Sequence, residues 1–503
     1  NDTVDEDGKV NGIMYQEGLP LVDEGAYTFS IFCDDSSESG EFIMLDEFKK
    51  QTNVDVDLKI YPYETATERL NLDLNSGDYA DVIGGWTLSD NAILTYGVNQ
   101  GVFIPLEDYF EKYCPNISAI LDLPGVREKM TAPDGHIYTI PYVCADSTVG
   151  YSPYINTKWL ENVGMSMPTT TDEFEAVLKA FKEQDANGNG DASDEIPFST
   201  DPNNKHIEAM AGYFGLPMNK LGIAIQNEKV VYGGVSDTYR EFLSWFHKLY
   251  AEGLVDVELY TQDSSTWEGK GNQDLYGVSI AYGSGEFTGI PAAEERGDFD
   301  SMPVLNTDKD GIWLRDTEGF SVYRTQAVIT NKAEHPEIIC RWFDNAFALE
   351  NGIGCNRGPV GVIVNKEDDG YHAIDTTTLS EEDQEKYSWG NLWPQSLPKY
   401  LPADFEFVEE HPMYDEKKAT EEAYEANLTK EIIPSYWIDL DKIDTFSDTN
   451  TAIKDFFEQQ QAQFVCGELD IDNDADWQAY VDGMYSLGLE DWVATQGIEE
   501  IAK

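Results

Sequence analysis

The chain has 503 residues, 41% of them hydrophobic, which is too long for one hydrophobic core and gives about two to four domains' worth of packing. Its 33 basic and 95 acidic residues give a formal net charge of −62, which repels phosphates and anionic lipid and argues against nucleic acid and membrane headgroups as partners. The six cysteines are widely spaced without a CxxC pair, which excludes a disulfide-dense scaffold or a zinc finger and leaves any pairing open. No apolar run reaches the roughly 18 residues that a membrane span needs.

The first 25 residues are polar and acidic and show little periodic hydrophobicity. Such a composition predicts a mobile leader. The chain starts at Asn1 without a signal peptide, as a trimmed mature form would.

A strand–helix–strand rhythm follows the leader. It predicts a largely parallel sheet with helices on both faces. In such sheets ligands bind beyond the carboxyl ends of the strands, where Asp34, Asp35 and Trp86 are expected to stand. The expected strands are residues 27–33, 54–60 and 81–84, and the expected helices are residues 42–52 and 65–76.

Further elements are predicted along the middle of the chain. Residues 106–113 and 156–164 have helical patterns, and the second of these ends at Gly164. Residues 134–142 (DGHIYTIPY) read as a hairpin that turns at Asp134-Gly135, and residues 278–282 read as a strand.

The stretch DANGNGDASDEIP, residues 185–197, has the pattern of a cation-binding loop. Oxygen-bearing side chains recur at every second position, and Gly188 and Gly190 between them permit sharp turns. Position 12 of an EF-hand would fall on Ile196, which cannot bind a metal, so the loop is not an EF-hand. We predict a structural calcium ion here, and a solvated acidic turn is the alternative. The predicted ligands are Asp185, Asn187, Asn189, Asp191, Asp194 and Glu195.

This loop follows the helix start PTTTDEF at residues 168–174, and the combination resembles the extracellular solute-binding proteins of bacterial ABC sugar importers, in their calcium-containing, oligosaccharide-binding subset. The phrase DGHIYTIPY, residues 250–255 (YAEGLV) and residues 464–488 resemble the same family in the same order. The resemblance implies an α/β, two-lobed periplasmic-binding-protein-like fold with a hinge, each lobe a mostly parallel sheet flanked by helices. It also implies a lipid-modified anchor upstream of the leader at the cell surface.

By the same resemblance the chain crosses between two lobes more than once. We expect a leader at 1–25, an N-terminal lobe from 26–142 and 322–394, and a C-terminal lobe from 143–321 and 395–503.

Aromatic side chains in loops are the natural candidates for sugar binding, because the C–H face of a sugar ring packs against an aromatic face while its hydroxyls take hydrogen bonds. Tryptophans in helical stretches are assigned to the core. Among polar groups we single out Asp34 and Glu286, for which a structural role is the alternative. The candidate aromatic residues are Trp86, Trp267, Trp313, Trp389 and Trp393.

Catalytic motifs are missing: the six histidines form no HExxH and no Walker lysine is present. We therefore expect no enzyme. The predicted function is extracellular binding of an oligosaccharide by hinge closure and its delivery to the membrane permease subunits of an ABC importer. We expect the protein to be a monomer and to bind no nucleic acid. The alternatives are a glycoside hydrolase that uses a carboxylate pair and a peptide-binding or adhesive surface protein.

Overall fold

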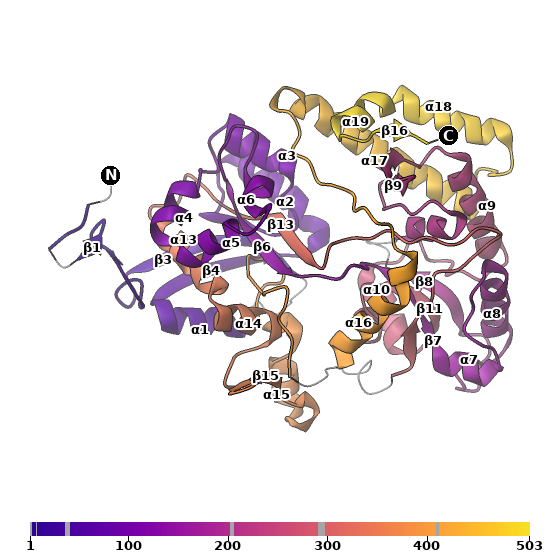
Figure 1. Cartoon of the computed structure of the whole chain (residues 1–503), viewed down its shortest axis with the longest axis horizontal. Helices are drawn as coiled ribbons and strands as arrows, with labels where there is room; N and C mark the ends of the chain where they lie inside the picture. Colours follow the sequence, from indigo (N-terminus) through magenta and orange to yellow (C-terminus); the bar gives the residue numbers. More distant parts are fainter. Residues whose placement is uncertain are drawn as a thin grey trace. The chain divides into compact units, whose positions relative to one another are not determined.

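The computed structural model describes residues 3–6, 8–35, 41–201, 206–289, 297–408 and 412–502 (Figure 1). The chain forms two compact units, and each is built from three separate segments. Unit 1 comprises Asn1–Asp146, Gly319–Glu409 and Trp437–Ile443, and unit 2 comprises Ser147–Glu318, Glu410–Tyr436 and Asp444–Lys503.

The observed crossings differ from the predicted ones mainly at the third position. The first two lie after Asp146 and Glu318, where 142 and 321 were expected, but the third lies after Glu409 rather than 394. The segment after 394 stays with unit 1 because Leu397 and Leu401 are buried in its cores. The short return of Trp437–Ile443 to unit 1 was not predicted.

The sheet of unit 1 has the order β4-β3-β5-β13-β6. Its half around β3 is parallel, as predicted, whereas β13 runs antiparallel to β5 and β6. The sheet is therefore mixed rather than mostly parallel. The strands are β3 (Tyr27–Asp34), β4 (Val54–Tyr61), β5 (Val82–Gly84), β6 (Thr139–Ala145) and β13 (Phe320–Ile329).

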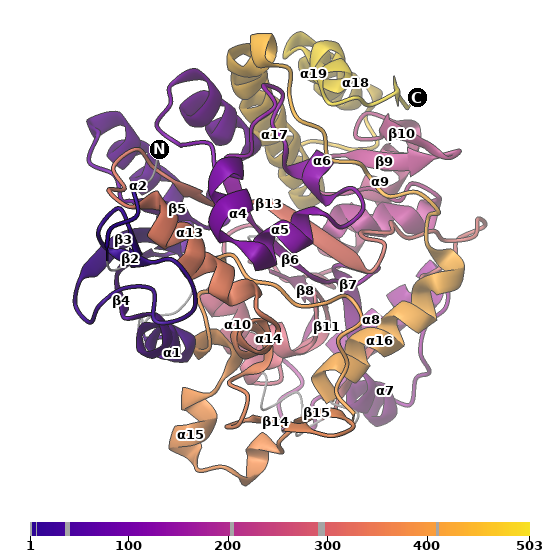
Figure 2. The same ribbon diagram turned by 60° about the vertical axis from the view of Figure 1, so that its left-hand side comes forward.

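Helices cover this sheet, and α4, α5 and α13 lie side by side (Figure 2). The helices predicted at 42–52, 65–76 and 106–113 are confirmed as α1, α2 and α4. The helices of unit 1 are α1 (Ile43–Thr52), α2 (Tyr63–Ser76), α3 (Asp90–Ala92), η1 (Ile93–Asn99), α4 (Glu107–Tyr113), α5 (Pro115–Leu121), α6 (Val126–Met130), α13 (Pro336–Asp344), η3 (Asn345–Phe347), α14 (Leu349–Arg357), η4 (Thr376–Thr378), α15 (Glu381–Lys386), η5 (Trp389–Asn391) and η7 (Leu440–Lys442).

Two short hairpins complete unit 1, β1 (Lys9–Val10) with β2 (Met14–Tyr15) and β14 (Val364–Glu367) with β15 (Gly370–Ala373). The first contradicts the predicted mobile leader. Apolar residues of the leader are buried, and the Arg341 guanidinium on α13 donates a hydrogen bond of 2.8 Å to the Gly18 carbonyl. The buried leader residues are Val10, Met14, Leu21 and Val22.

The predicted hairpin at 134–142 forms only in part. The turn is present, since the Gly135 amide donates to the Ala132 carbonyl at 2.9 Å. Its second arm becomes β6, but its first arm is not a strand, because the Ile137 amide donates to the Glu107 carboxylate instead.

Unit 2 holds a mixed sheet of order β12-β7-β11-β8, in which only β8 and β11 are parallel among the described strands. A smaller sheet has the order β16-β10-β9. The strands are β7 (Ser152–Asn156), β8 (Ile196–Thr200), β9 (Ile223–Gln226), β10 (Lys229–Tyr232), β11 (Tyr276–Ala281), β12 (Phe299–Ser301) and β16 (Glu500–Ile501).

The helices of unit 2 surround one large core, and the predicted helix at 156–164 is confirmed as α7. Among the helices that the structure describes, none is both long enough and apolar enough to cross a bilayer. The helices are α7 (Thr157–Val163), α8 (Thr171–Glu183), η2 (Ile207–Phe214), α9 (Asp237–Ala251), α10 (Ser264–Asn272), α11 (Gly285–Thr288), α16 (Pro412–Tyr424), η6 (Glu425–Asn427), α17 (Ile443–Cys466), α18 (Asp474–Ser486) and α19 (Leu489–Thr495).

Candidate binding site

The carboxyl ends of β3 and β5 in unit 1 are joined by Asp34. This fully buried carboxylate accepts the Trp86 amide at 3.0 Å and the Thr87 amide at 2.6 Å. Gly85, directly before Trp86, has a φ of +132°, and a Cβ there would stand 2.2 Å from Asp34 Oδ1. Asp34 was predicted to be a ligand-binding carboxylate. In the structure it is buried and fixes the turn that carries Trp86.

Trp86 presents its indole to solvent and is 44% exposed. Its ring meets Tyr323 of β13 edge-on, with centroids 5.3 Å apart and planes at 86°. Tyr323 in turn stacks on Tyr142 of β6 at 5.5 Å, and its hydroxyl donates to Asp146 Oδ2 at 2.6 Å. Trp86 is therefore exposed on one side and held by a packed aromatic pair on the other.

A second exposed tryptophan, Trp389 in η5, is 43% exposed. The Lys399 ammonium lies 5.8 Å from the Trp389 ring centroid and 4.9 Å from the Tyr142 ring centroid. These contacts connect both exposed indoles through three partly or fully buried side chains. We call Trp86, Tyr323, Tyr142, Lys399 and Trp389 the aromatic row.

Burial governs ionisation in the aromatic row. It raises the pKa of Tyr142 and of Tyr323, so both phenols stay protonated and act as hydrogen-bond donors. Burial also lowers the pKa of Lys399 to about 8.

Unit 2 has an aromatic group of its own around the end of β11. Tyr151 stacks on His206 with centroids 4.0 Å apart, and it meets Tyr282 edge-on at 6.1 Å. The Lys417 ammonium lies 3.9 Å from the Tyr282 ring centroid. Burial lowers the pKa of His206 to about 3, so its ring is neutral.

Glu286 is placed beside this group. Its carboxylate accepts the Tyr282 amide at 2.9 Å, which closes the turn after β11. The residue has an exposed surface, but protein atoms around its carboxyl displace water and raise its pKa to about 7. Glu286 is therefore at the expected strand end, with one oxygen already bound to the backbone.

The other three candidate tryptophans are core residues, each at most 2% exposed. Trp267 lies in α10 and donates to Ser279 Oγ at 3.2 Å, whereas Trp313 packs on Tyr213 and Trp393 stacks on Trp342. The expectation that loop position leaves these rings exposed is wrong, because residues near in space and far in sequence cover them.

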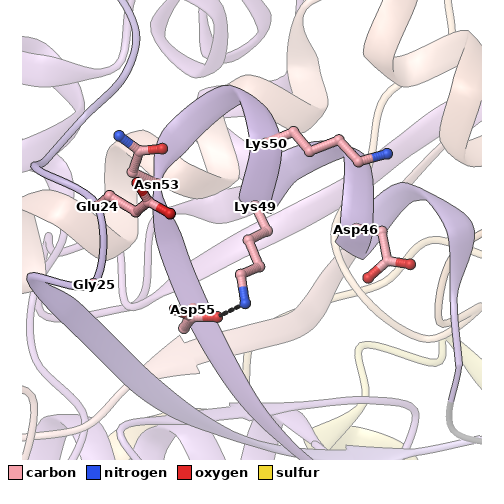
Figure 3. Close-up of a pocket in the computed structure, with 7 residues that line it drawn as sticks. All are labelled: Glu24, Gly25, Asp46, Lys49, Lys50, Asn53 and Asp55. Atoms are coloured by element: carbon pink, nitrogen blue, oxygen red, sulfur yellow. Dashed lines mark ion pairs between the residues drawn. The ribbon is translucent and has the colours of Figure 1, made fainter.

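The one hollow drawn in Figure 3 lies beside α1 and the starts of β3 and β4. It is lined by charged and polar residues, with Lys49 pointing toward Asp55 in a 2.5 Å ion pair and Lys50 extending away from that pair. This position is at the amino ends of the parallel strands, opposite the carboxyl ends that carry Trp86. The hollow contains no aromatic ring and is not the candidate site.

The predicted cation loop connects α8 to β8 and curls as expected. The Asn187 and Asn189 side-chain oxygens accept backbone amides two residues ahead, at 3.0 and 2.8 Å. Both oxygens of Asp194 accept the amide groups of these two asparagines. The loop thus gathers several oxygen-bearing side chains within one tight turn.

Two carboxylate oxygens of this loop, Asp185 Oδ1 and Glu195 Oε2, are buried without a hydrogen-bond partner. Burial raises the pKa of Glu195. Unpaired buried anionic oxygens are costly, and a bound cation removes that cost. By contrast, Asp191 is exposed and accepts hydrogen bonds from the Ser193 amide and hydroxyl, so it is the least suited of the predicted ligands.

Sequence reasoning did not find the buried members of either aromatic group. Tyr142 lies within the phrase DGHIYTIPY and Tyr282 directly follows a predicted strand, so both carried a positional signal. Nothing in the local sequence marks Tyr323, Lys399 or Lys417, because their roles come from neighbours distant in the chain.

Residues 36–352 match the family described as bacterial extracellular solute-binding protein. The chain is 32% identical over 368 residues to FusA of Streptococcus pneumoniae, named as a fructooligosaccharide ABC transporter substrate-binding protein; the match covers 71% of this chain and 66% of FusA. It is 28% identical over 280 residues to the lipoprotein LipO of Bacillus subtilis, covering 54% of this chain and 52% of LipO. The chain thus spans about two thirds or less of these relatives.

Solved structures of S. pneumoniae FusA are also similar. FusA in complex with kestose superposes with a TM-score of 0.81 at 27% identity, covering 93% of this chain and 98% of FusA. A FusA EF-hand mutant in complex with fructo-nystose gives a TM-score of 0.79 with the same identity and coverage. The predicted two-lobed α/β fold is confirmed by this likeness and by the two compact units.

Proposed function

The chain belongs to the family of bacterial extracellular solute-binding proteins, and from this premise we propose that it binds a neutral oligosaccharide outside the cell and delivers it to the permease subunits of an ABC transporter. The observation that carries the proposal is the aromatic row. Two indoles of unit 1 are 44% and 43% exposed: Trp86 follows the carboxyl end of β5, and Trp389 in η5 is connected through Gln395 to Asp35 after β3. Exposed aromatic faces of this kind suit the C–H faces of sugar rings.

The first ligand class to consider is a short fructo-oligosaccharide of the kestose type, since FusA is described in complex with kestose and with fructo-nystose. An anionic sugar is disfavoured by charge, because the chain's formal net charge is −62 and a uronate would approach against that field. Neither a glycoside hydrolase nor a peptide-binding or adhesive protein is favoured by the family match.

Calcium is the proposed cofactor. Two observations support it: the loop has two buried carboxylate oxygens without a hydrogen-bond partner, and an EF-hand is named for FusA. The proposed ligands are Asp185, Asn187, Asn189, Asp194 and Glu195. The ion would brace the connection of α8 to β8 and neutralise buried carboxylates. Its role would be stability rather than chemistry.

Transport requires that ligand binding change the protein's conformation. We propose that binding favours a closed form about the hinge, which follows only if the sugar binds that form more tightly than the open one. The protein would act as a monomer without catalysis. A lipid anchor to the cell surface is proposed as well, in line with the name of the relative LipO.

Titration calorimetry tests the proposed function. We expect at least one neutral oligosaccharide among kestose, nystose and a maltooligosaccharide to bind with a Kd of about a micromolar or tighter, and to be recovered unchanged afterwards. An oligogalacturonate and a peptide mixture serve as comparison ligands. The proposal would be contradicted if binding heat were measured only with the anionic sugar or with peptides. Release of shorter sugars from the oligosaccharide would contradict it as well.

A further inference from the structure

Lys399 is a buried cation of the aromatic row, between Tyr142 and Trp389. It is 1% exposed, and its ammonium lies over Tyr142 at 4.9 Å and over Trp389 at 5.8 Å. A lysine sealed from water between two rings is uncommon, because desolvating a charge costs free energy unless nearby groups compensate. A cation over aromatic rings gains more when it is desolvated.

One set of contacts connects Lys399 to the main chain of Trp389. The Lys399 ammonium donates to Gln395 Oε1 at 2.8 Å, and Gln395 Nε2 donates to the Trp389 carbonyl at 2.9 Å. The main-chain N–H of Gln395 donates to Asp35 Oδ2 at 2.7 Å, at the carboxyl end of β3. Lys399 thus orients the glutamine that fixes η5 to the sheet.

A second set of contacts leads from Lys399 to Trp86. Tyr142, beneath the ammonium, stacks on Tyr323 with planes at 22°, and Tyr323 is the ring against which Trp86 packs. The same cation therefore lies over Trp389 directly and is connected to Trp86 through the two stacked rings of Tyr142 and Tyr323.

The backbone around Lys399 is itself anchored to β6. The Val143 amide donates to the Lys399 carbonyl at 3.0 Å, and the Leu401 amide donates back to the Val143 carbonyl at 3.0 Å. Because the main chain is held on both sides, the ammonium is placed by the fold rather than by the ligand.

On this basis, and resting on the function proposed above, we propose that Lys399 is a positioning residue: its ammonium holds Trp86 and Trp389 in the geometry that binds sugar, and its protonation sets the affinity.

The charges that face Lys399 come from several elements. Asp35 after β3 favours the protonated amine, whereas Arg357 on α14 opposes it. The thiols of Cys355 on α14 and Cys144 on β6 also face the amine, but burial raises the pKa of both, so they are uncharged near pH 8. Burial outweighs the attraction to Asp35 and lowers the pKa of Lys399 from 10.5 to about 8. The cation is therefore present near neutral pH and lost as the pH rises through about 8, and with it the attraction to both rings.

Binding measurements test this inference with two variants. Lys399→Met, which keeps an unbranched side chain one atom shorter and loses the charge, is expected to weaken sugar binding about tenfold near neutral pH and to bind independently of pH. Lys399→Arg keeps a permanent charge and is expected to lose the fall in affinity that the wild type shows above pH 8. Lys50→Met, an exposed lysine of α1, is the matched control. Wild-type affinity in Lys399→Met, or the same pH profile in wild type and Lys399→Arg, would overturn the proposal.

A measurement without sugar separates this inference from the proposed function. Tryptophan fluorescence of the free wild-type protein is expected to change between about pH 7 and about pH 9.5, as the cation beside Trp389 is lost. The change should be absent from Lys399→Arg and from Trp389→Phe, with thermal melting as the check that each variant folds. A transition that persists in either variant contradicts the role of Lys399, whereas absence of sugar binding with the fluorescence result intact contradicts only the proposed function.

Discussion

Replacing Trp86 with alanine is expected to weaken oligosaccharide binding at least about 30-fold, on the order of 2 kcal/mol, the loss typical of an aromatic side chain that dominates a contact surface. The reason is that Asp34 and Tyr323 hold the ring in place before the ligand arrives, so the sugar does not have to order it. Calorimetry with the best sugar from the panel measures the change in Kd.

Two controls show whether the loss is specific to the ring. Trp86→Phe retains an aromatic face and is expected to bind more tightly than the alanine variant and less tightly than the wild type. Tyr485→Ala removes an equally exposed ring on α18 in unit 2, 41% exposed, and should bind as the wild type does. If alanine at position 86 left the Kd unchanged, the aromatic row would not be the binding surface.

Removing calcium is expected to lower the melting temperature by several degrees. A ligand that binds only the folded state stabilises it by about 2.7 kcal/mol at 100 times its Kd, and each kcal/mol shifts the melting temperature of a domain of about 150 to 250 residues by about 2 to 4 °C. Differential scanning calorimetry with chelator, and again after calcium is restored, measures the shift. The shift should reverse on adding calcium back.

Substitutions within the loop supply the matched comparison. Glu195→Gln removes one of the two buried unpartnered carboxylate oxygens and is expected to abolish the response to calcium. Asp191→Asn changes an exposed side chain that is bonded to Ser193 and is expected to keep that response. A wild-type melting curve that chelator does not move would contradict the calcium site, and an equal loss in both variants would contradict the choice of ligands.

Sequence patterns predicted the elements whose signals are local. The strand at 27–33 and the helix at 156–164 carry their own evidence, in β-branched and aromatic residues for the first and in an Asn156 cap and a Gly164 end for the second. The turns of the oxygen-rich loop at 185–195 were equally predictable, because side chains within the loop stabilise them.

Features that depend on distant partners were not predictable. The antiparallel half of the unit 1 sheet pairs β13 with β6. These strands are more than a hundred residues apart in sequence, so no local turn motif predicts that they pair. Trp393 looked available in a proline- and serine-rich loop, yet Trp342 from α13 covers it. The leader is likewise buried through single apolar residues that follow no helical or strand periodicity, so its composition wrongly predicted a mobile segment.

The same reasoning applies to the residues of the candidate site. The exposure of Trp86 was predictable because it directly follows a strand end. The burial of Asp34 was not, because the turn whose amides it accepts follows a different strand. Lys399 had no signal at all, since its environment combines β6, α14 and the end of β3.

Hydrogen–deuterium exchange of the intact protein, with and without the sugar that binds most tightly, tests the central claim most directly. The claim predicts slower amide exchange in residues 84–90 and 388–400, which carry Trp86 and Trp389, and no change in the α1 and β4 segment that borders the hollow of Figure 3. Saturating sugar that leaves both of those segments unprotected while slowing exchange elsewhere would place the ligand on another surface and contradict the account.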